Sequence, residues 1–200
     1  MSVHIYVEGG GSGALKSECR RGFAEFFGKF LPAGKRPKVI PCGSRNEAFD
    51  DFCTALRKSR GEHIVLLVDA EAPISPGQTI WTHLKQQDRW EPPNGATEEN
   101  THLMVQCMES WFLADSETLA TFFGQGFQAS ALPRNPNIEA VPKQDVLQTL
   151  MAATRQVKTK GTYSKSGHSF QILALIDPAK VRRASPHVER LAVALLRFAS

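Results

Sequence analysis

Hydrophobic positions in the first third of the chain follow two alternating patterns, short continuous apolar runs and a helical period. Three short apolar runs have the length and the β-branched content of strands; they occupy residues 4–7, 38–41 and 63–68. Between these runs, apolar residues recur every three or four positions, which is typical of one face of a helix. We therefore predict helices over residues 14–30 and over the segment that begins at Asn46, whose side chain is suited to cap it.

The order strand, helix, strand, helix, strand predicts a parallel sheet, because parallel neighbours need crossover helices. The run HIVLLV at residues 63–68 is apolar without interruption, as expected for a strand covered on both faces. The predicted fold class is therefore α/β, a Rossmann-like parallel sheet flanked by helices. Residues 1–125 are expected to form this core, and residues 126–200 a basic helical C-terminal extension packed on it.

Residues 72–102 interrupt the rhythm with several prolines and glycines. An insertion of this length in a compact domain is usually functional or disordered, and its tryptophans, Trp81 and Trp90, argue against disorder. We expect an ordered flap over the site. A further strand is predicted over residues 103–108, followed by a helix that begins near Asp115. Later helices are predicted over 144–154, 168–176 and 187–198.

Composition is that of a globular protein, with 42% hydrophobic and 22% charged residues. The net charge of +4 is uneven: residues 151–200 hold nine Lys or Arg against two acids, whereas residues 1–150 hold 15 against 18. The basic C-terminal part is suited to contact a polyanion, or it solvates the outer faces of terminal helices. Both interpretations stay open.

Location is expected to be cytoplasmic. The first ten residues lack the basic segment and long apolar run of a secretory signal, and no stretch reaches the roughly 20 apolar residues of a membrane span. The four cysteines are far apart and lie in apolar or amphipathic segments, which favours reduced thiols over disulfides.

Acidic residues follow three of the predicted strands. Glu8 ends the first, Asp69 and Glu71 end the third, and Glu109 ends the fourth. Ligands of open parallel sheets bind at the carboxyl ends of the strands, where these acids would meet and repel one another unless a cation is present. Oxygen-only ligands favour Mg²⁺ or Mn²⁺ over zinc. The alternative is that some of these acids cap a helix or turn, or, for Glu109, form a satisfied buried acid.

Glycines follow Glu8 directly, and Gly9, Gly10 and Gly11 permit a backbone that approaches a phosphate closely. They also precede a predicted helix N-terminus, which favours anions. A Walker loop is disfavoured because Gly-Lys-Ser/Thr is missing, and a dinucleotide fingerprint is disfavoured because Glu8 would repel pyrophosphate. A nucleophile elbow lacks the required scaffold and residue order.

Two motifs resemble the Toprim domain of topoisomerases, primases and OLD-type nucleases: Val7-Glu8-Gly9 and Asp69-Ala70-Glu71. The whole chain is similar to a bacterial Toprim-like family of unknown function, domain of unknown function 4276. The stretches that carry this similarity are IYVEGGG, CRRGF, RNEAFDDFCTAL, LLVDAE, HLMVQCMESWFLAD and GTYSKSGHSFQILALIDP. One departure is Glu71, because typical Toprim domains carry Asp at that position.

The resemblance implies a four-stranded parallel core and Mg²⁺-dependent chemistry on DNA or RNA. It also implies partnership with a separately encoded AAA/ABC-type ATPase in phage defence. On this interpretation Asp69 and Glu71 hold one Mg²⁺, and Glu8 joins a second metal or acts as a general base. Glu109 would complete or orient the metal shell.

Groups beyond the acids are candidates for substrate contacts. The polar loop KTKGTYSK offers ammonium groups to phosphate oxygens, or it is simply solvated; its lysines are Lys158, Lys160 and Lys165. His168 is a candidate to protonate the leaving oxygen, or it caps the following helix. Trp81 and Trp90 are candidates to stack on a base, or they anchor the core.

Three functions follow from these patterns. The first is a Mg²⁺-dependent nuclease. The second is a non-catalytic subunit that binds nucleic acid or regulates an ATPase complex. The third is a small-molecule phosphohydrolase that uses the same acids.

Overall fold

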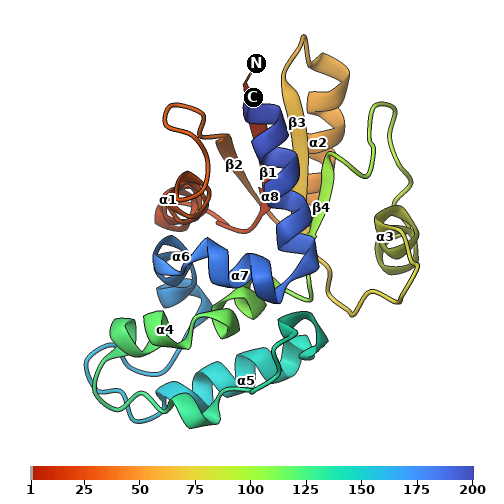
Figure 1. The fold of residues 1–200 in the computed structure, drawn as a ribbon. Helices are drawn as coiled ribbons and strands as arrows, with labels where there is room; N and C mark the ends of the chain where they lie inside the picture. The colour runs from red at the N-terminus through yellow and green to blue at the C-terminus, as the bar shows by residue number, and fades with distance from the viewer. Residues whose placement is uncertain (1) are drawn as a thin grey trace.

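The structure is a computed structural model that describes residues 2–200 (Figure 1). Its four strands form one parallel sheet in the order β2-β1-β3-β4, which confirms the predicted fold class. The strands are β1 (Val3–Glu8), β2 (Lys38–Gly43), β3 (His63–Asp69) and β4 (Thr101–Met104). The prediction of a strand over 103–108 was wrong in its bounds, because the chain leaves the sheet after Met104 and begins a 3₁₀ helix at Met108.

Eight α-helices and three 3₁₀ helices complete the described part of the chain. The α-helices are α1 (Ala14–Gly28), α2 (Arg45–Lys58), α3 (Ile80–Asp88), α4 (Ser116–Phe123), α5 (Lys143–Thr154), α6 (Lys165–Leu175), α7 (Pro178–Ala184) and α8 (Pro186–Ala199). The 3₁₀ helices are η1 (Met108–Ala114), η2 (Ala129–Ala131) and η3 (Ile138–Ala140). The predicted helices correspond to α1, α2, α4, α5, α6 and α8.

Helix α2 begins at Arg45, one position before its predicted cap. Ser44, and not Asn46, is the N-cap: its backbone N–H donates to Oε2 of Glu47 at 2.7 Å, and its Oγ accepts from the backbone N–H of Glu47 at 3.3 Å. This reciprocal pair is a capping box. It turns α2 away directly after β2, so the second residue of the helix cannot serve as its cap.

The two faces of the sheet are covered by different parts of the chain. Alternation along β1 directs Val3, Ile5 and Val7 to one face, where they share a hydrophobic cluster with Phe23 and other residues of α1. The opposite face of β3 packs against α2 in a second cluster around Phe52. The result is a three-layer arrangement, as expected for a sheet buried on both faces.

The 72–102 insertion packs on the α2 side of the sheet, beside β4 (Figure 1). Ile80, Leu84 and Trp90 are buried there with residues of α2, and the ring of Trp90 stacks on Phe49 at 4.1 Å between centroids. The segment therefore closes an edge of the hydrophobic core instead of forming a flap across the strand ends. Its apolar residues are used for packing, which is why it is ordered without covering a site.

The C-terminal helices bury their apolar residues in the same cluster as α1 and the sheet. In Figure 1, α8 crosses in front of the sheet, and α6 lies next to α1 below the carboxyl ends of the strands. Gly22 of α1 permits this close packing, since an added Cβ would lie 2.7 Å from the carbonyl oxygen of Phe170 in α6. Residues 126–200 thus complete the layer on one face of the sheet.

No helix among residues 2–200 is long and apolar enough to cross a membrane. The four cysteines carry free thiols, and all but Cys53 are buried.

We predict that Gly22→Ala destabilises the fold by about 1–3 kcal/mol, because the new methyl group forces α6 away from α1. Gly28→Ala on the same helix is the matched control. There the atoms nearest to the added Cβ belong to the guanidinium group of Arg36, an exposed side chain that can move aside. Stability should therefore change by less than about 1 kcal/mol. Chemical denaturation of both variants checks this, and equal effects would contradict the packing account.

Candidate metal centre

Three acids converge where β1 and β3 end side by side. Glu8 is the last residue of β1, Asp69 is the last residue of β3, and the two strands are paired in register up to Val7 and Leu67. One carboxylate oxygen from each of Glu8, Asp69 and Glu71 lies within 4.8 Å of the others. We call these three residues the acid cluster. The structure thus brings together the three acids that the sequence placed at these strand ends.

Glu71 reaches the acid cluster by a route that strand alternation does not describe. The strand ends at Asp69, and Glu71 adopts a left-handed backbone conformation with φ of 66°. Such a conformation is uncommon for a residue with a side chain and persists where surrounding contacts hold it. Here the backbone N–H of Glu71 donates to the carbonyl oxygen of Gln106 at 2.9 Å. The turn directs the Glu71 carboxylate back toward Asp69.

Burial makes the negative charge of the acid cluster costly. Asp69 is only 5% exposed, and its burial, together with the nearby carboxylates of Glu8 and Glu109, raises its pKa to about 7 against the pull of Lys143. Burial also raises the pKa of Glu8, although a hydrogen bond from the backbone N–H of Asp69 at 3.1 Å and the charge of Arg45 oppose the shift. The cluster therefore attracts protons or metal ions at neutral pH.

Lys143, the first residue of α5, supplies one positive charge to the acid cluster. Its Nζ lies 2.6 Å from Oε1 of Glu71 and 3.4 Å from Oδ2 of Asp69. Burial lowers the pKa of Lys143, but the charges of Asp69 and Glu71 outweigh this and the pKa is raised. The side chain is therefore an ammonium ion across the physiological range.

Arg45, the first residue of α2, supplies the second positive charge. Its Nη1 lies 3.5 Å from Oε2 of Glu8 and donates to the carbonyl oxygen of Asp69. The rest of the guanidinium binds both carboxylate oxygens of Asp88 at 2.8 and 2.7 Å and lies over the ring of Trp90. Through Arg45, the insertion that carries Asp88 and Trp90 supports the acid cluster from outside.

Glu109 lies outside the acid cluster. It is fully buried, and its Oε1 accepts hydrogen bonds from the hydroxyl groups of Tyr163 at 3.4 Å and Ser169 at 3.3 Å, with Nζ of Lys165 also at 3.3 Å. Its Oε2 has no hydrogen-bond partner among the described residues. The 3₁₀ helix η1 that replaces the predicted strand end carries Glu109 away from the other acids, so its predicted role as a metal ligand is not supported by the geometry.

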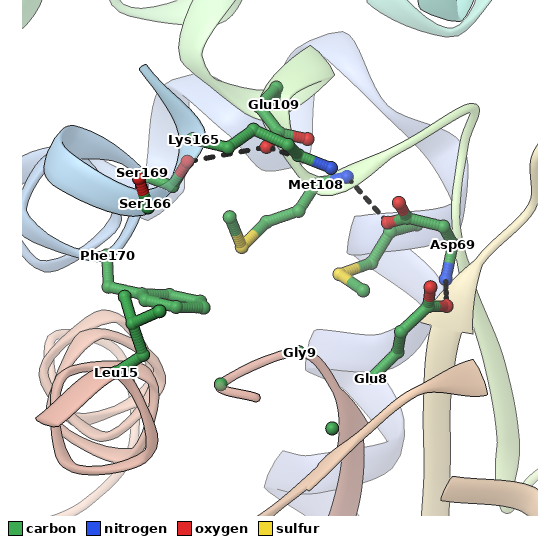
Figure 2. Close-up of a pocket in the computed structure, with 13 residues that line it drawn as sticks. Glu8, Gly9, Leu15, Asp69, Met108, Glu109, Lys165, Ser166, Ser169 and Phe170 are labelled. Carbon is green, nitrogen blue, oxygen red and sulfur yellow. Dashed lines mark hydrogen bonds and ion pairs between the residues drawn. The ribbon is translucent and has the colours of Figure 1, made fainter. Parts of the chain in front are cut away.

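A pocket of about 270 Å³ lies between the acid cluster and Glu109 with its hydrogen-bonded partners (Figure 2). Glu8 and Asp69 line one side, and Glu109, Lys165, Ser166 and Ser169 line the other. The walls between these polar ends are apolar; they include Leu15, Met104, Met108 and Phe170. The pocket therefore combines an acidic end, a basic side chain and a surface suited to an apolar or flat group.

The glycine loop forms the floor of this pocket through Gly9 and Gly10. Gly10 has φ of 84°, and an added Cβ would lie 2.9 Å from Cβ of Pro41, so only glycine fits. The backbone of Gly9 exchanges hydrogen bonds of 2.8 and 2.9 Å with Gly43 at the end of β2. Gly11 lies outside the pocket lining. The backbone N–H and carbonyl groups of Gly9 are thus already bonded to the end of β2, beside Glu8.

Four other predicted site residues lie away from the pocket lining. The Nδ1 of His168 accepts from the backbone N–H of Ser164, which corresponds to the capping alternative. The ring of His168 packs near Phe123. Lys160 lies over the ring of Phe122, and Lys158 is exposed in the same loop. Trp81 packs against the core cluster on the α2 side. Lys165 alone among the three loop lysines lines the pocket.

The sequence patterns did not indicate Arg45, Lys143 or Tyr163 as partners of the acids. Lys143 is 72 residues from Glu71 in the chain, and Tyr163 is 54 residues from Glu109. Arg45 and Lys143 each begin a helix, and neither position carries a local pattern that indicates a long-range ion pair. The nearest signal was the stretch GTYSKSGHS, which contains Tyr163, Lys165 and Ser169.

The acid cluster fits a hard divalent cation. Its donor set is oxygen only, which suits Mg²⁺ or Mn²⁺ and disfavours zinc. Burial and the nearby carboxylates raise the pKa of Asp69, so a bound cation would stabilise its ionised form. Glu8, Asp69 and Glu71 are the residues that would hold such an ion.

We predict that Asp69→Asn stabilises the metal-free protein by about 1–3 kcal/mol at pH 8, and by less near pH 5. The sign follows from the raised pKa: folding favours protonated Asp69, so its contribution to stability falls as pH rises from about 4 to about 7. Thermal melts in chelator at both pH values check this. Asp50→Asn, a change at an exposed acid of α2, is the control and should show little difference. The prediction would be wrong if the wild-type protein were more stable than Asp69→Asn at pH 8.

Comparisons with known proteins bear on the family alone. No curated protein matches this chain. No solved structure matches it either. Residues 7–196, a span that includes the acid cluster, Lys143 and the whole pocket lining, match a family described as "Domain of unknown function (DUF4276)". Because this match covers nearly the entire sequence, the chain belongs to that family.

Proposed function

We propose that this protein is a divalent-metal-dependent hydrolase that cleaves phosphodiester bonds in nucleic acid, with the acid cluster as its metal site. The observation that carries the proposal is the convergence of three carboxylate oxygens within 4.8 Å at the carboxyl ends of adjacent parallel strands. Carboxylates that repel one another at this distance are stabilised by a bound divalent ion. Mg²⁺ or Mn²⁺ is the expected cofactor.

A bound divalent ion would supply Lewis acidity toward a phosphate oxygen and lower the pKa of a water molecule. The residues of the chain then have separate roles. Lys165, with Nζ at the side of the pocket facing the acid cluster, is placed to neutralise the remaining charge of the phosphate. Glu109 pairs with Lys165 at 3.3 Å, and the hydroxyl groups of Tyr163 and Ser169 hold Glu109 in place. The apolar wall formed by Met108 and Phe170 is suited to a sugar or base next to the scissile phosphate.

The choice of nucleic acid as substrate also draws on the resemblance of VEGGG and LLVDAE to Toprim domains and OLD-type nucleases. The same resemblance suggests a separately encoded ATPase as partner and a role in phage defence. These assignments belong to the proposal, and purification with a candidate ATPase tests the partnership.

A small phosphomonoester is the second candidate substrate. The pocket of about 270 Å³ is small, and the proposed nucleic-acid contacts Lys158, Lys160 and Trp81 lie outside its lining. A short substrate would need only the pocket. The third candidate, a non-catalytic nucleic-acid-binding or regulatory subunit, requires no metal at the acid cluster.

We predict that the purified protein with Mn²⁺ or Mg²⁺ cleaves plasmid DNA or RNA, and that Glu8→Gln and Asp69→Asn each reduce the rate by at least about 100-fold, because each removes a metal ligand. Gel assays with supercoiled plasmid and labelled RNA provide the measurement. Asp50→Asn, which changes an exposed acid of α2, should keep the wild-type rate.

Two chromogenic substrates separate the alternatives. Bis(p-nitrophenyl) phosphate reports diesterase activity and p-nitrophenyl phosphate reports monoesterase activity. Faster turnover of the monoester favours the small-molecule phosphohydrolase. Cleavage of nucleic acid that survives both acid substitutions would exclude the acid cluster from the reaction. Calorimetry without any Mg²⁺ heat that depends on Asp69 would favour the non-catalytic subunit.

A further inference from the structure

The acid cluster is paired with a positive charge, the ammonium group of Lys143. This group bridges two of the three acids, at 2.6 Å from Oε1 of Glu71 and 3.4 Å from Oδ2 of Asp69. Its side chain is 25% exposed, so most of it is enclosed by protein. A cation in this position takes up space and lone pairs that a second metal ion would need.

The start of α5 holds Lys143 in place. The backbone N–H of Lys143 donates to Oε1 of Gln106 at 3.1 Å, and Nε2 of Gln106 donates to the carbonyl oxygen of Glu139 at 3.3 Å. One and two turns further along α5, Val146 and Leu150 are fully buried in the main hydrophobic cluster. The ammonium group therefore projects from a packed helix that is anchored on both sides.

The remaining carboxylate oxygens are sufficient for one ion. Oε2 of Glu8 accepts from the backbone N–H of Asp69, Oδ1 of Asp69 accepts from the backbone N–H of Met108 at 2.8 Å, and Oε1 of Glu71 accepts from Lys143. Oδ2 of Asp69 also accepts from Nζ of Lys143 at 3.4 Å, so Asp69 has both oxygens engaged by protein donors. Among the described residues, Glu8 and Glu71 each keep one oxygen without a protein donor. These two oxygens suit one Mg²⁺, which proteins bind through one or two carboxylates and which water or substrate oxygens complete.

Formal charge leads to the same limit. The acid cluster and Asp88 carry four negative charges, and Arg45 and Lys143 carry two positive charges within this network of ion pairs. The net charge of −2 is neutralised by one divalent ion. A second divalent ion would bring the network to +2 in a largely buried environment, which is unfavourable.

We infer that Lys143 limits the acid cluster to a single divalent ion, with its ammonium group in place of the second cation of a two-metal site. The inference rests on the proposed function, since it requires the acid cluster to bind metal. It distinguishes this protein from phosphodiesterases that clamp the substrate between two ions about 3.5–4 Å apart. Lys143 is then a determinant of metal stoichiometry.

The test is the number of Mn²⁺ ions bound, measured by titration calorimetry and by the paramagnetic resonance spectrum of Mn²⁺. Wild type should bind one ion with a mononuclear spectrum. Lys143→Met, which removes the charge and keeps the chain length, should bind two ions with the spectrum of a coupled pair. Lys143→Arg should bind one. Lys85→Met, which removes a lysine from an exposed ion pair with Glu91, is the charge-matched control and should also bind one.

Melting curves establish that each variant folds, and Lys143→Gln, which keeps a hydrogen-bond donor, is the second variant if Lys143→Met does not fold; it too should bind two ions. Two ions in wild type, lost in Asp69→Asn, would overturn the inference and leave the proposed function intact. One ion in wild type and in both uncharged variants would also overturn the inference. No ion in wild type would overturn both the inference and the proposed metal site.

Discussion

Repulsion among carboxylates held at the ends of two adjacent strands is the constraint on which the other features of this site depend. Main-chain pairing of β1 with β3 leaves Glu8 and Asp69 no freedom to separate, and the left-handed turn at Glu71 adds a third acid. Buried like charges at this spacing are unfavourable by several kcal/mol in isolation. The surrounding structure is therefore organised to supply positive charge.

That positive charge comes from opposite sides of the sheet. Arg45 reaches the cluster from α2 and is fixed by Asp88 and Trp90 of the insertion, whereas Lys143 reaches it from α5 in the C-terminal region. A single hydrophobic cluster joins α5 and α6 to the sheet, so the C-terminal region is part of the site as well as of the core. This arrangement explains why residues far apart in the chain are needed for one small centre.

A second buried acid, Glu109, is treated differently. Two hydroxyl groups and Lys165 converge on one of its oxygens, and the pocket separates this group from the acid cluster. The two polar ends of the pocket thus differ in character, because one is a cluster of acids and the other presents a lysine. Such a pairing suits a phosphate ester, whose oxygens would face a metal on one side and an ammonium group on the other.

Local patterns in the sequence determined the first three strands, the principal helices, the parallel class of the sheet and the strand ends that carry Glu8 and Asp69. Strand and helix periods, and the edge at which parallel strands end, are local properties. The left-handed turn that brings Glu71 to the same place is not one of them. Tertiary structure decided the rest. Packing of Trp90 against Phe49 placed the insertion beside the core. The 3₁₀ helix after β4 positioned Glu109 outside the acid cluster. Lys143 forms an ion pair with Glu71, although 72 residues separate them in the chain. Contacts of this kind depend on how whole helices pack on the sheet, and no spacing within a single segment encodes them.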